Sequence, residues 1–125
     1  MPFVEIYSNL CLPPEGRDSL LSRVRECVSE AFDSPRETVT LWLHENKREN
    51  TLYAGDGSRG LLAVIVHCFA GRTREQKRRL YTGINRAAEE LCSGPVLCQV
   101  TVEESPKENW GIRKGLCAAD VLGEN

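Results

Sequence analysis

The feature of this sequence that most constrains its fold is an internal repeat. The two halves share one order of strand, helix and strand, and their apolar helix positions coincide without a gap. A shift of 60 residues places Leu20 on Leu80, Val24 on Ile84, Val28 on Ala88 and Pro35 on Pro95. Such a repeat predicts two copies of one β-α-β unit that pack together, because a single unit cannot bury its apolar surface alone.

The first unit contains two strand patterns around an amphipathic helix. Residues 4–7 alternate apolar and polar side chains, and residues 38–43 are rich in β-branched and apolar side chains, so both are predicted strands. Between them, apolar residues recur at spacings of three and four and predict a helix that ends before Pro35. These helix residues are Leu20, Leu21, Val24, Val28, Ala31 and Phe32.

The second unit repeats this order. Strands are predicted over residues 61–69 and about 96–103, with a helix from about Arg74 to Cys92 between them. Thr73 and Gln76 have the spacing of a capping box at the start of this helix. The glycine-rich residues 53–60 are interpreted as the connector between units, and residues 105–115 as a polar turn around Trp110. The residues past Leu116 are interpreted as a short tail or edge strand.

These elements predict an α/β (α+β) fold in a single domain over residues 1–125, with pseudo-repeat units at about 1–60 and 61–125. The two units would form one four-stranded sheet with two helices on one face. Since the parallel strands of each unit bury their helix on one side only, the other sheet face is left apolar. We therefore expect self-association to cover that face.

Composition and hydropathy exclude several classes of partner. The 125 residues carry 16 Lys and Arg against 18 Asp and Glu, a net charge of -2, which gives no global attraction for nucleic acid. The longest apolar run, residues 61–66, is far below the roughly 20 residues that a membrane helix requires, and the N-terminus lacks the basic flank of a signal peptide. The sequence thus predicts a cytoplasmic protein with neither a nucleic-acid nor a membrane partner.

The six cysteines are predicted to be free thiols that act as small apolar side chains. They are scattered through apolar segments without a Cys-x-x-Cys pair, and only two histidines are present to assist a metal site, so we predict no metal and no cofactor. His44 and His67 lie in predicted strands, where a satisfied structural histidine is the favoured interpretation. The cysteines are Cys11, Cys27, Cys68, Cys92, Cys98 and Cys117.

The second residue, Pro2, stands at the start of the first predicted strand. If Met1 is removed, which is usual before a small residue, Pro2 becomes a secondary amine with a free lone pair. An α-amino group has a reference pKa of about 7.7–8.0, and apolar or cationic surroundings lower it, so this nitrogen is a candidate general base near neutral pH. By position alone, the alternative is a proline whose missing N–H costs nothing at the first residue of a strand.

Arg72 and Arg74 flank the expected helix cap, Thr73. Arg72 has no basic counterpart in the first unit, where Leu12 stands at the equivalent position. A helix N-terminus presents free N–H groups, and an arginine adds a bidentate fork that suits a carboxylate, so the two arginines are a candidate site for a small organic acid. The alternative is one solvated basic helix face that also includes Lys77, Arg78 and Arg79.

The segment around Trp110 is a turn that combines a glycine, an aromatic residue and a charge. Such turns often line a pocket or a subunit boundary, which makes Trp110 a candidate pocket residue. A simple packing anchor is an equal alternative, because an indole combines a large apolar area with one hydrogen-bond donor.

Together these features resemble the tautomerase superfamily, in particular its branch of 4-oxalocrotonate tautomerase and malonate semialdehyde decarboxylase-like proteins. The resemblance covers essentially the whole chain. It is carried by the Met-Pro start, the tandem units and two segments, Ala70-Gly71-Arg72-Thr73-Arg74-Glu75-Gln76-Lys77 and Glu108-Asn109-Trp110-Gly111-Ile112-Arg113. His44-Glu45-Asn46 is similar to the decarboxylase-like branch.

The resemblance implies a catalytic amino-terminal proline and arginines that hold the substrate carboxylate and polarise its carbonyl. These roles would belong to Pro2, Arg72 and Arg74, while Trp110 would be the aromatic residue that closes the pocket. The resemblance also implies isomerase (tautomerase) activity without a cofactor on a small 2-keto or enol carboxylic acid. The expected assembly is a homotrimer whose sheets face inwards, and the expected partner is a small-molecule carboxylate substrate.

The sequence departs from the family pattern at two places. The family's strand arginine corresponds here to Thr40 and Gln99, so Thr40 is expected at the substrate without a positive charge. The aspartate of the decarboxylase pattern corresponds to Thr38, with Glu37 beside it on the opposite face of any strand.

Two alternatives therefore stay open beside the tautomerase hypothesis. A malonate semialdehyde decarboxylase-like decarboxylase or hydratase of a three-carbon acid would need Glu37 in place of the missing aspartate. A non-catalytic trimeric binding module would explain the missing strand arginine. Retention of Met1 would favour the binding module, because acylation removes the basicity of the Pro2 nitrogen.

Overall fold

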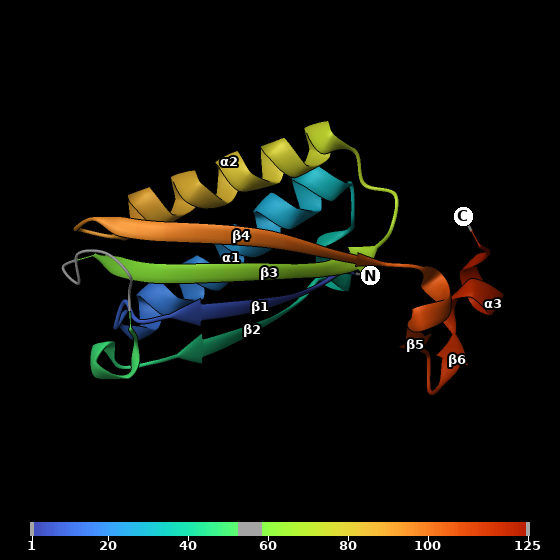
Figure 1. Cartoon of the computed structure of the whole chain (residues 1–125), viewed down its shortest axis with the longest axis horizontal. Helices are drawn as coiled ribbons and strands as arrows, with labels where there is room; N and C mark the ends of the chain where they lie inside the picture. Colours follow the sequence, from blue (N-terminus) through green and yellow to red (C-terminus); the bar gives the residue numbers. More distant parts are fainter. Residues whose placement is uncertain (1, 53–58, 125) are drawn as a thin grey trace.

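The computed structural model describes residues 2–52 and 59–124 and contains one mixed sheet covered by two helices (Figure 1). The first unit consists of β1 (Phe3–Ser8), α1 (Pro14–Phe32) and β2 (Thr40–Glu45), and the second of β3 (Gly60–Phe69), α2 (Arg74–Leu91) and β4 (Val96–Ser105). Strands are parallel within each unit, and β1 and β3 join the units antiparallel in the order β2-β1-β3-β4. The predicted α+β fold of tandem β-α-β units is confirmed.

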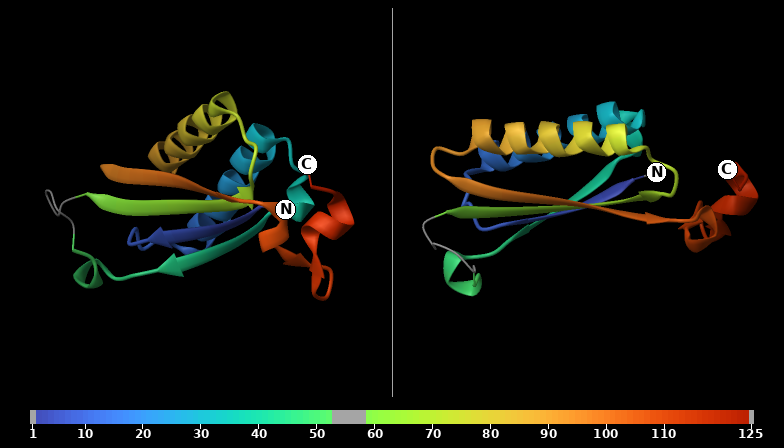
Figure 2. Two further views of the ribbon diagram at one scale, coloured as in Figure 1. Left: turned by 45° about the vertical axis from the view of Figure 1, so that its right-hand side comes forward. Right: turned by 45° about the horizontal axis from the view of Figure 1, so that its top comes forward.

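The core lies between the sheet and the helices. Alternate residues of β3 are buried, and Val4 and Ile6 of β1 have no exposed surface. Both helices lie on one face of the sheet, and the opposite face is uncovered (Figure 2). All six cysteines are free, as predicted. The buried helix residues are Leu20, Val24, Val28, Ala31 and Phe32 in α1, and Leu80, Ile84, Ala87 and Ala88 in α2.

Each helix begins at a recognisable signal. α1 begins at Pro14, because a proline in the first helical turn needs no partner for a backbone N–H. α2 begins with the predicted capping box, in which the Thr73 hydroxyl accepts from the Gln76 backbone N–H and the Gln76 side chain accepts from the Thr73 backbone N–H. Within the described residues, no helix combines the length and the apolarity that crossing a membrane requires.

The second strand of the first unit begins two residues later than predicted. Thr38 lies in the short 3-10 helix η1 (Arg36–Thr38) rather than in a strand, because its backbone N–H and its hydroxyl both donate to the Pro35 carbonyl. Another 3-10 helix, η2 (Arg48–Asn50), follows β2. The predicted connector covers residues 53–60. Of these, residues 53–58 lie outside the described part of the chain.

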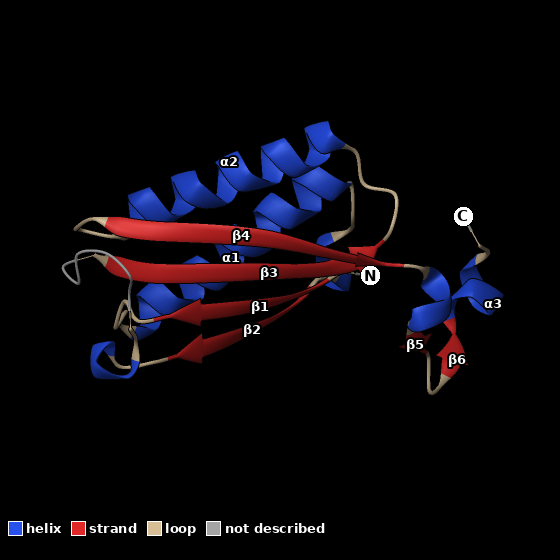
Figure 3. Cartoon of the chain, in the orientation of Figure 1, coloured by secondary structure: helices blue, strands red, loops and turns tan. Residues whose placement is uncertain are grey.

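The C-terminal segment is more structured than the predicted turn and tail. It contains η3 (Lys107–Asn109), a hairpin of β5 (Gly111–Ile112) and β6 (Leu116–Cys117), and a short helix α3 (Ala118–Leu122). The prediction of a tail or edge strand after Leu116 is therefore wrong beyond Cys117, where burial of Ala118 and Ala119 fixes the helix. This segment projects beyond the end of the sheet (Figure 3).

The uncovered sheet face, called the open face, carries large side chains. Trp42 is 58% exposed and Tyr7 is 36% exposed. The Tyr7 hydroxyl donates to Glu5 at 3.0 Å, and its ring stacks on His44 with 4.5 Å between the ring centroids. The second apolar face that the sequence predicts is thus present and exposed in a single chain.

Candidate active site

One end of the sheet contains most of the candidate residues, and we call it the Pro2 end. β1 and β2 begin there while β3 and β4 end there, and the N-terminus lies beside the end of β3 (Figure 1). Pro2 precedes β1, Thr40 begins β2, and the Thr40 N–H donates to the Pro2 carbonyl at 3.4 Å. Arg72 follows β3 and Trp110 follows β4, so four separate segments contribute.

The Pro2 ring is buried. Because Phe3 pairs with His67 in the antiparallel register, Pro2 lies level with Cys68, on the side of the sheet that faces the helices. Burial raises the pKa of the Cys68 thiol, although the nearby Arg72 opposes this effect. The neighbour of Pro2 in the register is therefore a neutral thiol within the core.

Arg72 is half-buried and contacts the end of α1. Its Nη1 donates to the Phe32 carbonyl at 3.0 Å, and its Cζ lies 5.0 Å from the centroid of the Phe32 ring. Its Nε is buried and has no hydrogen-bond partner in the described part of the chain. The guanidinium thus keeps one unused donor at the Pro2 end. A buried donor without an acceptor is uncommon and costly.

Glu104 of β4 fixes the loop that carries Arg72. Its Oε2 accepts from the backbone N–H groups of Gly71 at 2.8 Å and Arg72 at 3.3 Å, and its Oε1 forms an ion pair with Lys77. Burial raises the pKa of Glu104, but the Lys77 ammonium and the two backbone donors outweigh burial and hold the pKa below its usual 4.5. Gly71 has a φ of 115°, a conformation that favours glycine. The loop therefore depends on Glu104 and Gly71.

Glu104→Gln is expected to destabilise the protein by about 2 kcal/mol at about pH 7, because a hydrogen bond to a charged group contributes about 1.5–3 kcal/mol. The pKa of Glu104 is lower in the folded than in the unfolded chain, so the stabilisation is present above about pH 4.5 and is lost as the pH falls through the folded pKa. Urea denaturation over this pH range measures both effects. The neighbouring Glu103→Gln serves as control, since Glu103 is exposed; equal destabilisation in both variants would contradict this role.

Arg74 is exposed at the first position of α2, and its side chain has no ion-pair or hydrogen-bond partner within residues 2–52 and 59–124. Four of the backbone donors around it already have acceptors. The capping box occupies the N–H groups of Thr73 and Gln76, and Glu104 occupies those of Gly71 and Arg72. An anion here would therefore meet the arginine side chains and, from the first turn of α2, only the backbone N–H groups of Arg74 and Glu75.

Of the other basic residues near the start of α2, Arg78 and Arg79 are exposed like Arg74, whereas Lys77 is half-buried like Arg72, so the alternative of one solvated basic face fits only Arg74, Arg78 and Arg79. Lys77 pairs with Glu104, and Arg78 and Arg79 approach Glu75 at 3.8 Å and 3.6 Å. Arg72 and Arg74 thus differ from their basic neighbours in that neither has a carboxylate partner on its side chain within the described residues.

Trp110 belongs to an aromatic cluster on the open face. Its Nε1 donates to the Ser105 hydroxyl at 2.9 Å, and its ring meets the edges of Phe69 and Phe3 with centroid distances of 5.1 Å and 6.0 Å. Phe3 in turn stacks on His67 at 4.3 Å. Trp110 is therefore a packing anchor with a satisfied donor, and it contacts Phe3, the residue after Pro2, on the sheet face opposite to the buried Pro2 ring.

Sequence reasoning missed the pair formed by His67 and Glu5. His67 Nε2 lies 2.7 Å from Glu5 Oε2, and this hydrogen bond, together with that from Tyr7, lowers the pKa of Glu5. The favoured interpretation of His67 as a satisfied structural histidine agrees with this contact. The partner could have been found only from the pairing of β1 with β3, because the two residues are 62 positions apart.

The residues that stand in place of the strand arginine and of the decarboxylase aspartate lie at different places. Glu37 and Thr38 are exposed residues of η1, so the expectation that they occupy opposite faces of a strand is wrong. η1 leads into Thr40, which places Glu37 near the Pro2 end. Gln99 instead pairs with Ala63 near the opposite end of the sheet, so it does not contribute to the Pro2 end of its own chain.

This fold and this end of the sheet define the class of protein to which the chain is related. A family model described as tautomerase enzyme matches residues 51–113, about half of the chain. The 2-hydroxymuconate tautomerase of Pseudomonas putida is 35% identical over 48 residues, which are 38% of this chain and 76% of that protein. The chain belongs to the tautomerase family.

Solved structures share the fold over nearly the whole chain. Pt0534 inactivated by 2-oxo-3-pentynoate has a TM-score of 0.86 and 28% identity, covering 96% of this chain and 98% of that one. A fused 4-OT wild-type symmetric trimer has a TM-score of 0.85 and 24% identity, with 96% and 98% covered. FG41 malonate semialdehyde decarboxylase inhibited by 3-bromopropiolate has a TM-score of 0.80 and 20% identity, with 98% and 97% covered. The last two show the fold alone, whereas family membership makes this chain a tautomerase-like or related enzyme.

Proposed function

We propose that the protein is a cofactor-independent tautomerase that ketonises a small enol carboxylic acid, with Pro2 as general base after removal of Met1. The observation that carries this proposal is the position of Pro2, Arg72 and Trp110, which come from three separate segments, at one end of the sheet. Thr40, bonded through its backbone to Pro2, would border the same substrate.

In the proposed reaction a proton moves from oxygen to carbon through the Pro2 nitrogen. The nitrogen takes the proton of the enol hydroxyl, the O–H electron pair forms the ketone C=O bond, and the C=C electron pair moves to the terminal carbon. That carbon takes a proton from the Pro2 ammonium, which regenerates the free base. Proton transfer by a positioned group contributes roughly 10²- to 10⁴-fold to a rate.

Arg72 and Arg74 would hold the substrate carboxylate. One nitrogen of Arg72 is used by the Phe32 carbonyl and its Nε is buried, so a carboxylate oxygen would bond to the guanidinium N–H groups that stay accessible in this half-buried side chain. Arg74 is exposed and brings a second positive charge. Trp110 would provide an apolar wall.

The test compares two N-termini. Ketonisation of phenylenolpyruvate and of 2-hydroxymuconate is followed by ultraviolet absorbance for the protein that begins at Pro2 and for one with a single glycine ahead of Pro2. The extension converts the amine to an amide, so kcat/KM should fall by about 100-fold or more, with mass spectrometry to verify both termini. Equal turnover by both forms would sink the general-base proposal, and no turnover by either would favour a binding module.

Decarboxylation is the second candidate, because the Glu37 carboxylate lies in the turn that leads into Thr40 at the Pro2 end. It would need Glu37 to act in place of the aspartate that the decarboxylase pattern contains. Release of carbon dioxide from malonate semialdehyde, abolished by Glu37→Gln, would support it over ketonisation. The absence of release would remove it.

We further propose that the protein is a homotrimer that associates through the open face. A solvent-exposed apolar group as large as Trp42 on an uncovered sheet indicates an interaction surface. The open face is continuous with the aromatic cluster of Phe3, Phe69 and Trp110, so assembly would also cover the Trp110 side of the Pro2 end. The similar fused 4-OT is a symmetric trimer.

Trp42→Glu is expected to convert the assembly to monomers, because an unpaired carboxylate in an interface is strongly unfavourable. Analytical ultracentrifugation measures the mass, and circular dichroism confirms that the variant is folded. Tyr81→Glu is the matched control, since Tyr81 is exposed on α2, away from the open face. A wild-type protein that sediments as a monomer, or a Trp42→Glu variant that stays assembled, would refute the interface.

A further inference from the structure

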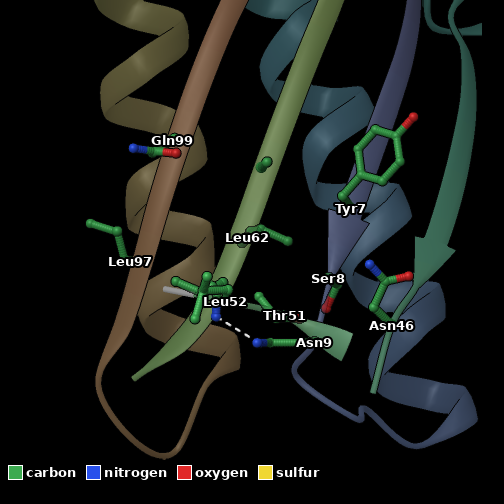
Figure 4. Close-up of a pocket in the computed structure, with 11 residues that line it drawn as sticks. Tyr7, Ser8, Asn9, Asn46, Thr51, Leu52, Leu62, Leu97 and Gln99 are labelled. Atoms are coloured by element: carbon green, nitrogen blue, oxygen red, sulfur yellow. Dashed lines mark hydrogen bonds between the residues drawn. The ribbon is translucent and has the colours of Figure 1, made fainter. Parts of the chain in front are cut away.

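The opposite end of the sheet, which we call the far end, contains a cavity of about 340 Å³. This volume suits a small molecule. The cavity lies where β1 ends and β3 begins, and Gln99 of β4 and Asn46 after β2 lie at its two sides (Figure 4). The proposed reaction at the Pro2 end makes no use of it.

The internal repeat relates the far end to the Pro2 end. The pairing of Phe3 with His67 is repeated as Ala63 with Tyr7, and the pairing of Phe3 with Thr40 is repeated as Ala63 with Gln99. The ion pair of Lys77 with Glu104 is repeated as Arg17 with Glu45 at 3.1 Å, and η3 is repeated as η2. The cavity therefore occupies the place that corresponds to the proposed active site.

The side chains at the two ends are very different. Three aromatic residues at the Pro2 end, Phe3, Phe69 and Trp110, correspond at the far end to Ala63, Asn9 and Thr51. Because the repeat makes the strands at the two ends equivalent, the absence of these three aromatic rings from the far end explains why a cavity is present there. Pro2 corresponds to Leu62 and Arg72 to Leu12, so the far end lacks both the base and the arginine.

The cavity lining contains amides but no charged side chain among the described residues. Asn9 is buried, and its Oδ1 accepts from the Leu61 N–H at 2.7 Å, which leaves its amide nitrogen as a donor. The side chains of Asn46 and Gln99 have no hydrogen-bond partner in the described part of the chain. Around these amides the lining is apolar and includes Leu97 and Ala63.

We infer that the far end is a second, non-catalytic binding site for a small uncharged molecule with an apolar body and an amide or carbonyl group. The apolar body contacts Ala63 and Leu97, and the polar group bonds to the amides. A carboxylate is selected against, because none of the described lining residues is a cation that could compensate its desolvation. The Pro2 end is thus proposed to bind an anion and the far end an uncharged molecule.

The test uses two probes of the same shape, 4-fluorobenzamide and 4-fluorobenzoate, observed by fluorine NMR on the assembled protein. Benzamide should bind at least tenfold more tightly than benzoate. Ala63→Leu, which fills the cavity, should weaken benzamide binding at least tenfold, and Asn46→Ala should weaken it about fivefold through the lost hydrogen bond. Thr101→Leu adds volume on the open face outside the cavity and should leave binding unchanged, with ultracentrifugation to verify the assembly of each variant.

Three results would overturn this inference: equal binding of both probes to the wild type, benzamide binding that survives Ala63→Leu, or no benzamide binding because a neighbouring copy fills the cavity. Ala63→Leu should leave the ketonisation of phenylenolpyruvate unchanged. Failure at the far end is therefore distinguishable from failure of the proposed function.

Discussion

Pro2→Ala is expected to lower kcat/KM for phenylenolpyruvate by about 100-fold, toward the lower limit of a general-base contribution. After Met1 removal the variant retains an α-amino group, so a base is still present. What the variant loses is the ring, which is buried at the start of β1 level with Cys68 and fixes the direction of the nitrogen lone pair. Steady-state kinetics on proteins with verified N-termini measures the effect.

A stability measurement separates this loss from unfolding. Removing the buried methylenes of Pro2 should cost about 1–2 kcal/mol, which lowers Tm without unfolding the protein at room temperature. Pro13→Ala is the matched control, because Pro13 is exposed ahead of α1 and should change neither activity nor Tm greatly. If Pro2→Ala were folded and fully active, the amino-terminal base would have to be abandoned.

The fold could be predicted because both of its signals are visible in the sequence itself. Helix periodicity is local, and the repeat recurs at a constant shift of 60 residues. Leu20 and Leu80 are equally buried, as their equivalence requires. These signals could not predict the conformation of Thr38. Its β-branched side chain favours a strand, but in the structure its hydroxyl donates to the Pro35 carbonyl in a turn. The helix after Cys117 was also missed, because five residues are too few for helical periodicity to be recognised.

The candidate site was predictable as a set of residue types but not as a set of contacts. Met-Pro and the arginines are visible in the sequence, whereas the partners that position them are distant along the chain. The Phe32 carbonyl lies 40 positions from Arg72, and Glu104 lies 32 positions away. Only the folded sheet joins these groups, so the unused Nε donor of Arg72 could not be foreseen.

Arg72→Leu, which introduces the residue found at the equivalent position 12, is expected to lower kcat/KM by about 10²- to 10³-fold, chiefly through a higher KM. It should also cost about 1–3 kcal/mol of stability, because the Phe32 carbonyl loses its donor. Arg74→Leu is the comparison variant. Arg74 is exposed and has no partner in the described chain, so this variant should lower activity while leaving Tm unchanged.

Because Arg72 also anchors the end of α1, a fall in activity alone would not identify a carboxylate-binding role. The methyl ester of phenylenolpyruvate separates the two roles, since it keeps the enol and loses the charge. The wild type should prefer the acid strongly, and Arg72→Leu should prefer it much less, because only Arg74 is then left of the two arginines proposed to hold the carboxylate. If the ratio of acid to ester stays at the wild-type value while Tm falls, Arg72 acts only as a structural contact to Phe32, and the carboxylate must be held by Arg74 or by a neighbouring copy of the chain.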